Sequence, residues 1–221
     1  MTAPAAFRTR LIVCFAIIYI VWGSSYLVTS VGVHHLPPFL FAGIRFMIAG
    51  IALAVVARAR GERIAVGATD VKQLLVMALL LIAVSNGFNE WALQWVPSSQ
   101  AALLNVTSSF WIAIFGLHGV RGQPIDRRTG IGLALGFFGT VAIVWPREGF
   151  STAHVVPQLG ILVGCLGWAA GTIYFRNAQK ALDILAFTGL QMLAGGAMLT
   201  AIGLGLGEQH QWNWSAPGML A

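Results

Sequence analysis

Long apolar stretches separated by short polar segments dominate the chain. Each stretch is about 20 residues long, which is what a helix needs to cross a hydrocarbon core of roughly 30 Å. Seven stretches are expected to be membrane-spanning helices: Leu11–Val33, Pro38–Ala57, Leu74–Val96, Ser99–Val120, Thr129–Trp145, Leu159–Ala178 and Ile184–Leu206. A membrane β-barrel would instead alternate in polarity over segments of about ten residues, and the sequence has no such alternation. The pattern therefore predicts an all-α integral membrane protein.

Composition agrees with a chain embedded in a lipid bilayer. The sequence is 57% hydrophobic and 9% charged, whereas a soluble domain has about 25% charged residues. So few charges cannot cover a surface exposed to water. The first apolar run continues to Val33 without an A-x-A cleavage site, so we expect a retained helix rather than a signal peptide.

The basic residues indicate an orientation. Of the 13 lysines and arginines, eleven precede the first span or follow the second, fourth and sixth. The opposite loops hold Arg147 alone, and Arg45 lies within a span. By the positive-inside rule, this distribution predicts a cytoplasmic N-terminus. The basic excess is thereby explained, and no nucleic-acid partner is expected.

The sequence repeats itself after 146 residues. The shift pairs six residues with identical ones: Trp22 with Trp168, Leu36 with Leu182, Phe41 with Phe187, Gly43 with Gly189, Gly50 with Gly196, and Leu53 with Leu199. It aligns the first span with the sixth and the second with the seventh, so the unit has five helices. Because five is odd, the second unit must be inserted upside down. Such inverted repeats are typical of secondary transporters, whose substrate site lies near the midplane.

The same repeat predicts the domain organisation. Residues 1–150 would form the first five-helix unit, and residues 151–221 would begin the second. The shift places Ala221 on Leu75, near the start of the third span. We therefore expect an inverted-repeat helical bundle of which seven of ten helices are present.

Two opposite charges lie within spans at similar depth. Arg45 is roughly 10 Å and Glu90 roughly 9 Å below the same membrane surface, as counted along their helices. A charge within a membrane needs a partner, so we expect the two side chains to pair. One interpretation is a purely structural ion pair. The other is a cavity pair that a charged substrate or a proton can separate.

Further polar and aromatic residues recur at helical spacing in the spans. Asn86, Glu90 and Gln94 are four residues apart, which predicts one shared helix face. We expect twelve residues to line a substrate cavity: Trp22, Ser25, Tyr26, Arg45, Asn86, Glu90, Gln94, Asn105, Ser108, Trp111, Trp168 and Gln191. Polar contacts that only join helices are the alternative. No catalytic group, metal or cofactor is expected.

Glycines form two ridges that predict close helix packing. The members share spacings of three or four residues: Gly160, Gly164, Gly167 and Gly171 in the sixth span, and Gly132, Gly136 and Gly139 in the fifth. No strand precedes either ridge and no Lys-Ser pair closes it, so no phosphate loop is expected.

Three stretches together resemble a known family. They are WGSSYLVTSVGVHHLPPFLFAGIRF from Trp22 to Phe46, ALQWVPSSQAALLNVTSSFW from Ala92 to Trp111, and GIGLALGFFGTVAIV from Gly130 to Val144. They are similar to EamA-type members of the drug/metabolite transporter superfamily. The resemblance implies a ten-helix fold of two inverted units that moves amino acids, nucleotide-related compounds or other metabolites.

We therefore expect a multi-pass transporter of small metabolites, such as amino acids or related compounds, in the cytoplasmic (inner) membrane, with efflux as the expected direction. Its partners would be the lipid bilayer, the small-molecule substrate and a coupling proton, and a homodimer stays open. The alternatives are a non-transporting fragment or accessory subunit and, less favoured, a membrane-embedded transferase. A transferase would need paired carboxylates, a metal set or a nucleophile with a base, which the spans lack. We therefore expect that the protein is not an enzyme.

Overall fold

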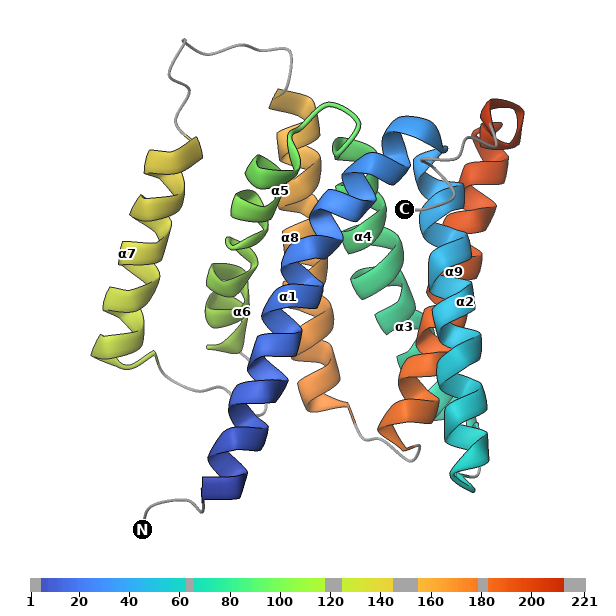
Figure 1. Ribbon diagram of the computed structural model, residues 1–221, viewed down its shortest axis with the longest axis horizontal. Helices are drawn as coiled ribbons and strands as arrows, with labels where there is room; N and C mark the ends of the chain where they lie inside the picture. The colour runs from blue at the N-terminus through green and yellow to red at the C-terminus, as the bar shows by residue number, and fades with distance from the viewer. Residues whose placement is uncertain (1–4, 63–65, 118–124, 145–154, 179–182, 213–221) are drawn as a thin grey trace.

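The computed structural model describes residues 5–62, 66–117, 125–144, 155–178 and 183–212, and within these ranges it contains helices and no strand. The helices lie side by side in a bundle (Figure 1). In the described part of the chain, each of the seven predicted spans contains helix, which confirms the predicted all-α class. We call the bundle end that holds the start of α1 the proximal end and the opposite end the distal end. Along the described chain, the helices follow in the order α1 (Ala5–His35), α2 (Pro38–Ala59), α3 (Ala68–Met77), η1 (Ala78–Val84), α4 (Ser85–Ala92), α5 (Ser98–Asn105), α6 (Ser108–Gly116), α7 (Arg127–Val144), α8 (Val155–Asn177), α9 (Ile184–Gly205) and η3 (Glu208–Gln211).

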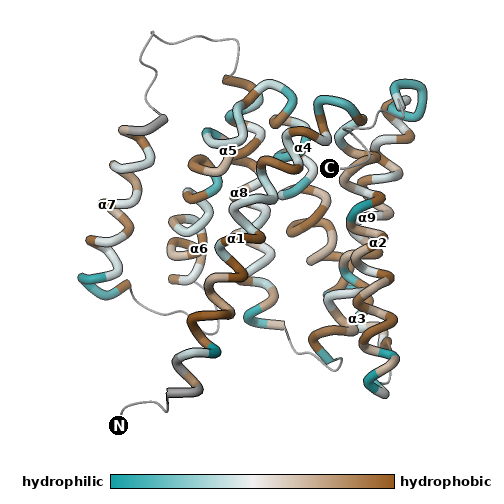
Figure 2. Tube along the Cα trace, in the orientation of Figure 1, coloured by the Kyte–Doolittle hydropathy of each residue, from teal (hydrophilic) through white to brown (hydrophobic). Residues whose placement is uncertain are grey.

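Five segments of the described chain are long and apolar enough to cross a membrane. They are Thr9–His35, Pro38–Ala59, Ala68–Ala92, Val155–Asn177 and Ile184–Gly205. Hydrophobic residues follow α2 and the proximal part of α1, while hydrophilic residues gather near helix ends (Figure 2). These features define a multi-pass membrane protein, because every backbone polar group inside a bilayer needs a partner within its own helix.

Two of the predicted spans depart from a regular α-helix. The third begins at Ala68 rather than Leu74 and contains a π-helical segment, η1, between α3 and α4. The fourth is divided into α5 and α6, with Val106 and Thr107 between them. Irregular backbone at membrane depth is tolerated only where protein or a water-filled cavity surrounds it. Both irregular segments are therefore expected to border a cavity.

Helices α2 and α9 run antiparallel (Figure 1) and touch through two pairs of glycines. A Cβ built on Gly43 would lie 2.9 Å from the carbonyl oxygen of Gly196, and one on Gly196 would lie 2.8 Å from that of Gly43. The corresponding distances are 2.8 Å from Gly50 to Gly189 and 3.1 Å in the reverse sense. The 146-residue shift exchanges Gly43 with Gly189 and Gly50 with Gly196. It therefore converts one contact into the other, as a two-fold axis across the helices would.

The two glycine ridges behave differently. In α8, a Cβ on Gly164 would lie 2.9 Å from the carbonyl oxygen of Ser85, and one on Gly167 would lie 3.0 Å from that of Leu80. This ridge packs closely on η1 and α4, as predicted. In α7, Gly132 and Gly139 face nothing within 4 Å among the described residues. A Cβ on Gly136 would lie 3.7 Å from the ring of Phe110, and α7 meets α6 through a Phe110–Phe137 ring pair with centroids 5.6 Å apart. Close packing of this ridge stays a prediction.

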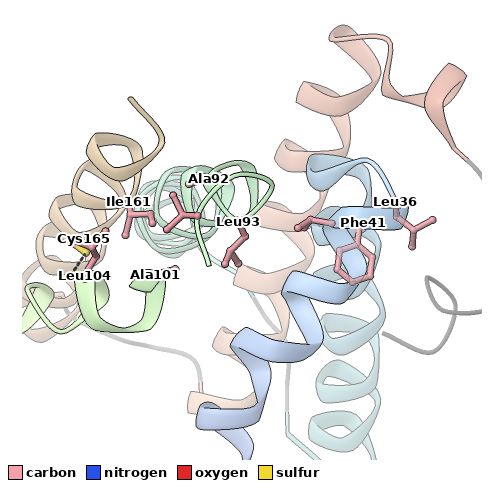
Figure 3. Packing of buried hydrophobic residues seen from close by; sticks show 10 residues of the cluster. Leu36, Phe41, Ala92, Leu93, Ala101, Leu104, Ile161 and Cys165 are labelled. Atoms are coloured by element: carbon pink, nitrogen blue, oxygen red, sulfur yellow. Dashed lines mark hydrogen bonds between the residues drawn. The ribbon is translucent and has the colours of Figure 1, made fainter. Parts of the chain in front are cut away.

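A buried apolar cluster joins the helices around the distal half of the bundle. Figure 3 shows eight labelled members: Leu36, Phe41, Ala92, Leu93, Ala101, Leu104, Ile161 and Cys165. The Sγ atom of Cys165 lies 3.6 Å from the carbonyl oxygen of Leu104. Cys14 is exposed, and both cysteines are free thiols. The cluster holds α4, α5 and α8 together beside the site described next.

Candidate functional site

A cavity of about 270 Å³ lies between α1, α2, α4, the α5–α6 break and α8. Its walls mix amide, hydroxyl and charged groups with aromatic rings, which suits a small amphipathic ligand. It is lined by Trp22, Ser25, Tyr26, Thr29, Arg45, Phe46, Ser85, Asn86, Asn89, Glu90, Asn105, Ser108 and Trp168. Nine of the twelve residues expected from the sequence are in this set. The structure therefore brings most of the predicted residues together.

The π-helical segment turns the polar face of α4 towards the cavity. Asn86 begins this face just after η1, and its Nδ2 donates to the carbonyl oxygen of Leu81 at 2.7 Å. That bond gives a partner to a carbonyl of the irregular segment. Asn89 and Glu90 follow at helical spacing and line the same cavity. Single π-turns are frequent at functional sites because they reorient the residues after them.

The break between α5 and α6 places a second polar wall opposite α4. The hydroxyl of Thr107 donates to the carbonyl oxygen of Leu104 at 2.6 Å, and that of Ser108 donates to the carbonyl oxygen of Asn105 at 2.7 Å. Side chains thus partner carbonyls near the interruption. The Nδ2 atom of Asn105 also donates to Asn89 Oδ1 at 2.8 Å, which links the two polar walls.

An ion pair joins two walls of the cavity. Nη1 of Arg45 lies 3.2 Å from Oε1 of Glu90, which confirms the predicted pairing of α2 with the third span. The same nitrogen donates to the hydroxyl of Thr29 in α1 at 3.0 Å. The guanidinium also lies over the ring of Phe41, 5.0 Å from its centroid. Glu90 is 3% exposed, and its Oε2 has no hydrogen-bond partner among the described residues.

Aromatic rings from repeat-related positions meet at the cavity. The centroids of Trp22 in α1 and Trp168 in α8 are 6.3 Å apart at an angle of 54°. The 146-residue shift relates these two residues, as it relates the glycines of α2 and α9. Tyr26 and Phe46 add two further rings to the lining. The rings offer flat apolar surfaces beside the charged and amide groups.

Three residues expected in the cavity lie elsewhere. Helix α4 ends at Ala92, so the four-residue spacing does not carry Gln94 onto the same face. Gln94 donates to the carbonyl oxygen of Trp91 at 3.0 Å and borders a separate apolar pocket. Trp111 packs against the buried apolar cluster. Gln191, the repeat partner of Arg45, is buried within α9 and does not line this cavity.

Four cavity residues were not predicted from the sequence. They are Thr29, Phe46, Ser85 and Asn89. Two carried a readable signal, because Thr29 follows Ser25 by four residues and Asn89 follows Asn86 by three. Ser85 depends on the π-helical segment before it. Phe46 looks like any other apolar residue of its span.

Comparisons with known proteins assign the family. Residues 10–145 match the EamA-like transporter family, and the chain belongs to it. The chain is 31% identical over 209 residues to the uncharacterized inner membrane transporter YedA of Escherichia coli (strain K12), a match that covers 92% of this chain and 65% of the relative. It thus spans slightly less than two thirds of that relative's length.

Two further relatives and one solved structure are similar. The uncharacterized transporter YvbV of Bacillus subtilis (strain 168) is 28% identical over 95% of this chain and 68% of its own length. The probable amino-acid metabolite efflux pump of Escherichia coli (strain K12) is 26% identical over 74% of this chain and 52% of its own length. One crystal structure matches with a TM-score of 0.64 at 22% identity, over 84% of this chain and 63% of that chain. That last likeness supports the fold alone.

Proposed function

We propose that this protein is a secondary transporter that moves small metabolites, amino acids or related compounds, across the cytoplasmic (inner) membrane, with efflux as the direction. The observation that carries the proposal is the cavity with the Arg45–Glu90 pair on its wall. Polar and charged groups within a bundle of membrane-spanning helices are costly and usually serve a substrate or ion path. The printed names of the relatives, an inner membrane transporter and an amino-acid metabolite efflux pump, support the same function.

The proposed architecture is a pair of inverted five-helix units, with residues 1–150 in the first and residues 151–221 beginning the second. The reciprocal glycine contacts of α2 and α9 support it, as do the opposite directions of α1 and α8 (Figure 1). In inverted-repeat transporters the site lies where the units meet. The cavity fits this position, since Trp22 and Trp168 reach it from repeat-related helices. A proton at Glu90 is the candidate coupling ion.

Filling the cavity tests the proposed function. The protein, expressed from its own gene and purified into liposomes, is expected to transport at least one compound of a metabolite panel. Ser108→Trp is expected to abolish that uptake, because the new ring would occupy the cavity that Ser108 lines. The matched control is Leu135→Trp, since Leu135 is 69% exposed on α7. A folded wild-type protein that transports nothing, or a Ser108→Trp protein that transports normally, would contradict the proposal.

Orientation is the second part of the proposal: the N-terminus is cytoplasmic. The end of α2, the start of α7 and the end of α8 lie at the proximal end (Figure 1), and the described basic residues in or next to these helix ends are Arg58, Arg60, Arg127, Arg128 and Arg176. Arg63, Arg121, Arg147 and Lys180 lie outside the described residues. The positive-inside rule places the proximal end in the cytoplasm.

Cysteine labelling of intact cells checks this orientation. In a Cys14→Ala, Cys165→Ala background, His35→Cys is expected to react with an impermeant maleimide added outside. Arg60→Cys is expected to react only after the cells are opened. Both positions are exposed, so accessibility of the side chain does not bias the comparison. Strong outside labelling of Arg60→Cys would reverse the proposed topology.

A further inference from the structure

Helix α1 consists of an exposed part and an anchored part. Every residue from 11 to 24 is exposed, and we call this segment the α1 arm. Ser25 and Tyr26 are half-buried at the cavity, and the first fully buried residue of the helix is Thr29, which is 5% exposed. Gly32 and Val33 follow, with the ring of Phe41 lying against Gly32. Thr29 is therefore the first residue after the exposed arm that is buried among other helices.

The residue at this boundary is bonded to the charged pair of the cavity. Nη1 of Arg45 donates to the Thr29 hydroxyl at 3.0 Å and to Glu90 Oε1 at 3.2 Å. One guanidinium nitrogen thus joins α1, α2 and α4. Because both bonds start from that nitrogen, a movement of the guanidinium that follows Glu90 would also change its bond to Thr29.

The unpartnered Oε2 atom of Glu90 is a hydrogen-bond acceptor that a ligand could use. Glu90 Oε2 is buried and has no partner among the described residues, although a buried carboxylate normally accepts bonds at both oxygens. The Glu90 side chain lines the cavity. A ligand that donates to this oxygen would draw Glu90 away from Arg45.

We propose that Thr29 is a positioning residue that couples the Arg45–Glu90 pair to the α1 arm, and thereby sets how Trp22 lies relative to Trp168. This inference rests on the proposed function, in which the cavity receives the substrate. When a ligand displaces Glu90, Arg45 leaves the Thr29 hydroxyl. The arm, which carries Trp22 on one wall of the cavity, is then released from its link to α2 and α4.

Spin labels on α1 and α8, both near the proximal end of the bundle, test the coupling without any substrate. Leu11→Cys on the arm and Asn177→Cys at the end of α8 are both at exposed positions. They are placed in the Cys14→Ala, Cys165→Ala background of the protein expressed from its own gene, and electron paramagnetic resonance measures their distance distribution in liposomes. Thr29→Val is expected to change the ratio of arm positions about tenfold, the effect of losing a hydrogen bond to a charged group.

Three further variants make the result specific. Thr29→Ser keeps the hydroxyl and is expected to retain the wild-type distribution. Ser24→Val is the matched control, because the Ser24 hydroxyl bonds the carbonyl oxygen of Val21 in its own helix, at 3.2 Å, and no other described residue. Glu90→Gln is expected to shift the arm in the same direction as Thr29→Val. The double variant should shift no further, since coupled residues are not additive.

A wild-type distribution in the Thr29→Val protein would overturn the inference, as would full additivity with Glu90→Gln. If Thr29→Val does not fold, Glu90→Gln alone decides, because an unchanged arm in that variant also contradicts the coupling. The measurement needs no transported compound. An inactive protein whose arm responds as described would therefore contradict the proposed function while supporting the coupling.

Discussion

The Gly50→Val substitution is expected to destabilise the protein by more than about 3 kcal/mol, beyond the usual cost of an overpacked core. A Cβ at Gly50 would lie 2.8 Å from the carbonyl oxygen of Gly189 and 2.8 Å from the nitrogen of Leu193. Both are backbone atoms of α9, so no side-chain rotation can relieve the contact. The helices would have to separate along the crossing that α2 and α9 share.

The loss of stability is measured as a melting temperature in detergent, with size-exclusion chromatography used to monitor how much folded protein is left after heating. Gly139→Val is the matched control, because a Cβ at Gly139 meets nothing within 4 Å among the described residues. Gly189→Val, at the other side of the same contact, should also lower the melting temperature but by less, because its Cβ would lie 3.1 Å from the carbonyl oxygen of Gly50. Equal stability of the Gly50→Val and Gly139→Val proteins would show that the crossing is not close-packed.

The positions of the spans could be predicted because the bilayer imposes a one-dimensional constraint. A helix must be long and apolar enough to cross, and this is visible in the sequence without knowledge of neighbours. The Arg45–Glu90 contact was predictable for a related reason. A charge within a membrane needs a partner, and counting along two antiparallel helices placed both residues at one depth.

The local shape of the third and fourth spans could not be predicted in the same way. The π-helical segment has the sequence ALLLIAV, which is also suitable for a regular α-helix. Its geometry depends on neighbours such as Asn86, whose side chain bonds the carbonyl oxygen of Leu81. The sequence prediction assumed regular α-helical spacing and therefore placed Gln94 on the polar face, although α4 ends at Ala92. The prediction for Gln94 failed because side-chain hydrogen bonds such as that of Asn86 stabilise an irregular backbone that the sequence pattern does not reveal.

A carboxylate that caps a distant helix also had no local signal. Glu208 in η3 is 5% exposed, and its two oxygens accept from the backbone nitrogens of Phe39 and Leu40 at 3.3 and 2.8 Å. These nitrogens belong to the first turn of α2, where a negative group is favourable. In α9 the cap is local, because Asp183 accepts from Leu185 at 2.9 Å. The repeat partner of Asp183 is Pro37, which has no capping side chain, so α2 receives its carboxylate from a remote segment.

The two members of the ion pair are expected to respond unequally to substitution. Side-chain exposure is 4% for Glu90 and 36% for Arg45. Arg45→Gln leaves a buried carboxylate without its cation and is expected to cost about 3–5 kcal/mol, the usual penalty for breaking a buried pair. Glu90→Gln leaves a guanidinium that still reaches the cavity, so its stability loss should be smaller. Glutamine is a suitable replacement for Arg45, because Gln191 occupies the repeat-related position in α9.

Thermal unfolding of the single and double variants, together with transport by the same preparations, separates the structural interpretation of the pair from the functional one. The double variant Arg45→Gln, Glu90→Gln should recover stability relative to Arg45→Gln, since no unpaired charge is left. If the pair were only structural, the double variant would also transport nearly as well as the wild type. We instead expect Glu90→Gln alone to abolish transport in a folded protein, because Glu90 is the one carboxylate among the described residues that line the cavity. Normal transport by the Glu90→Gln protein would remove Glu90 from the site, and equal losses of stability in the two single variants would contradict the difference in burial.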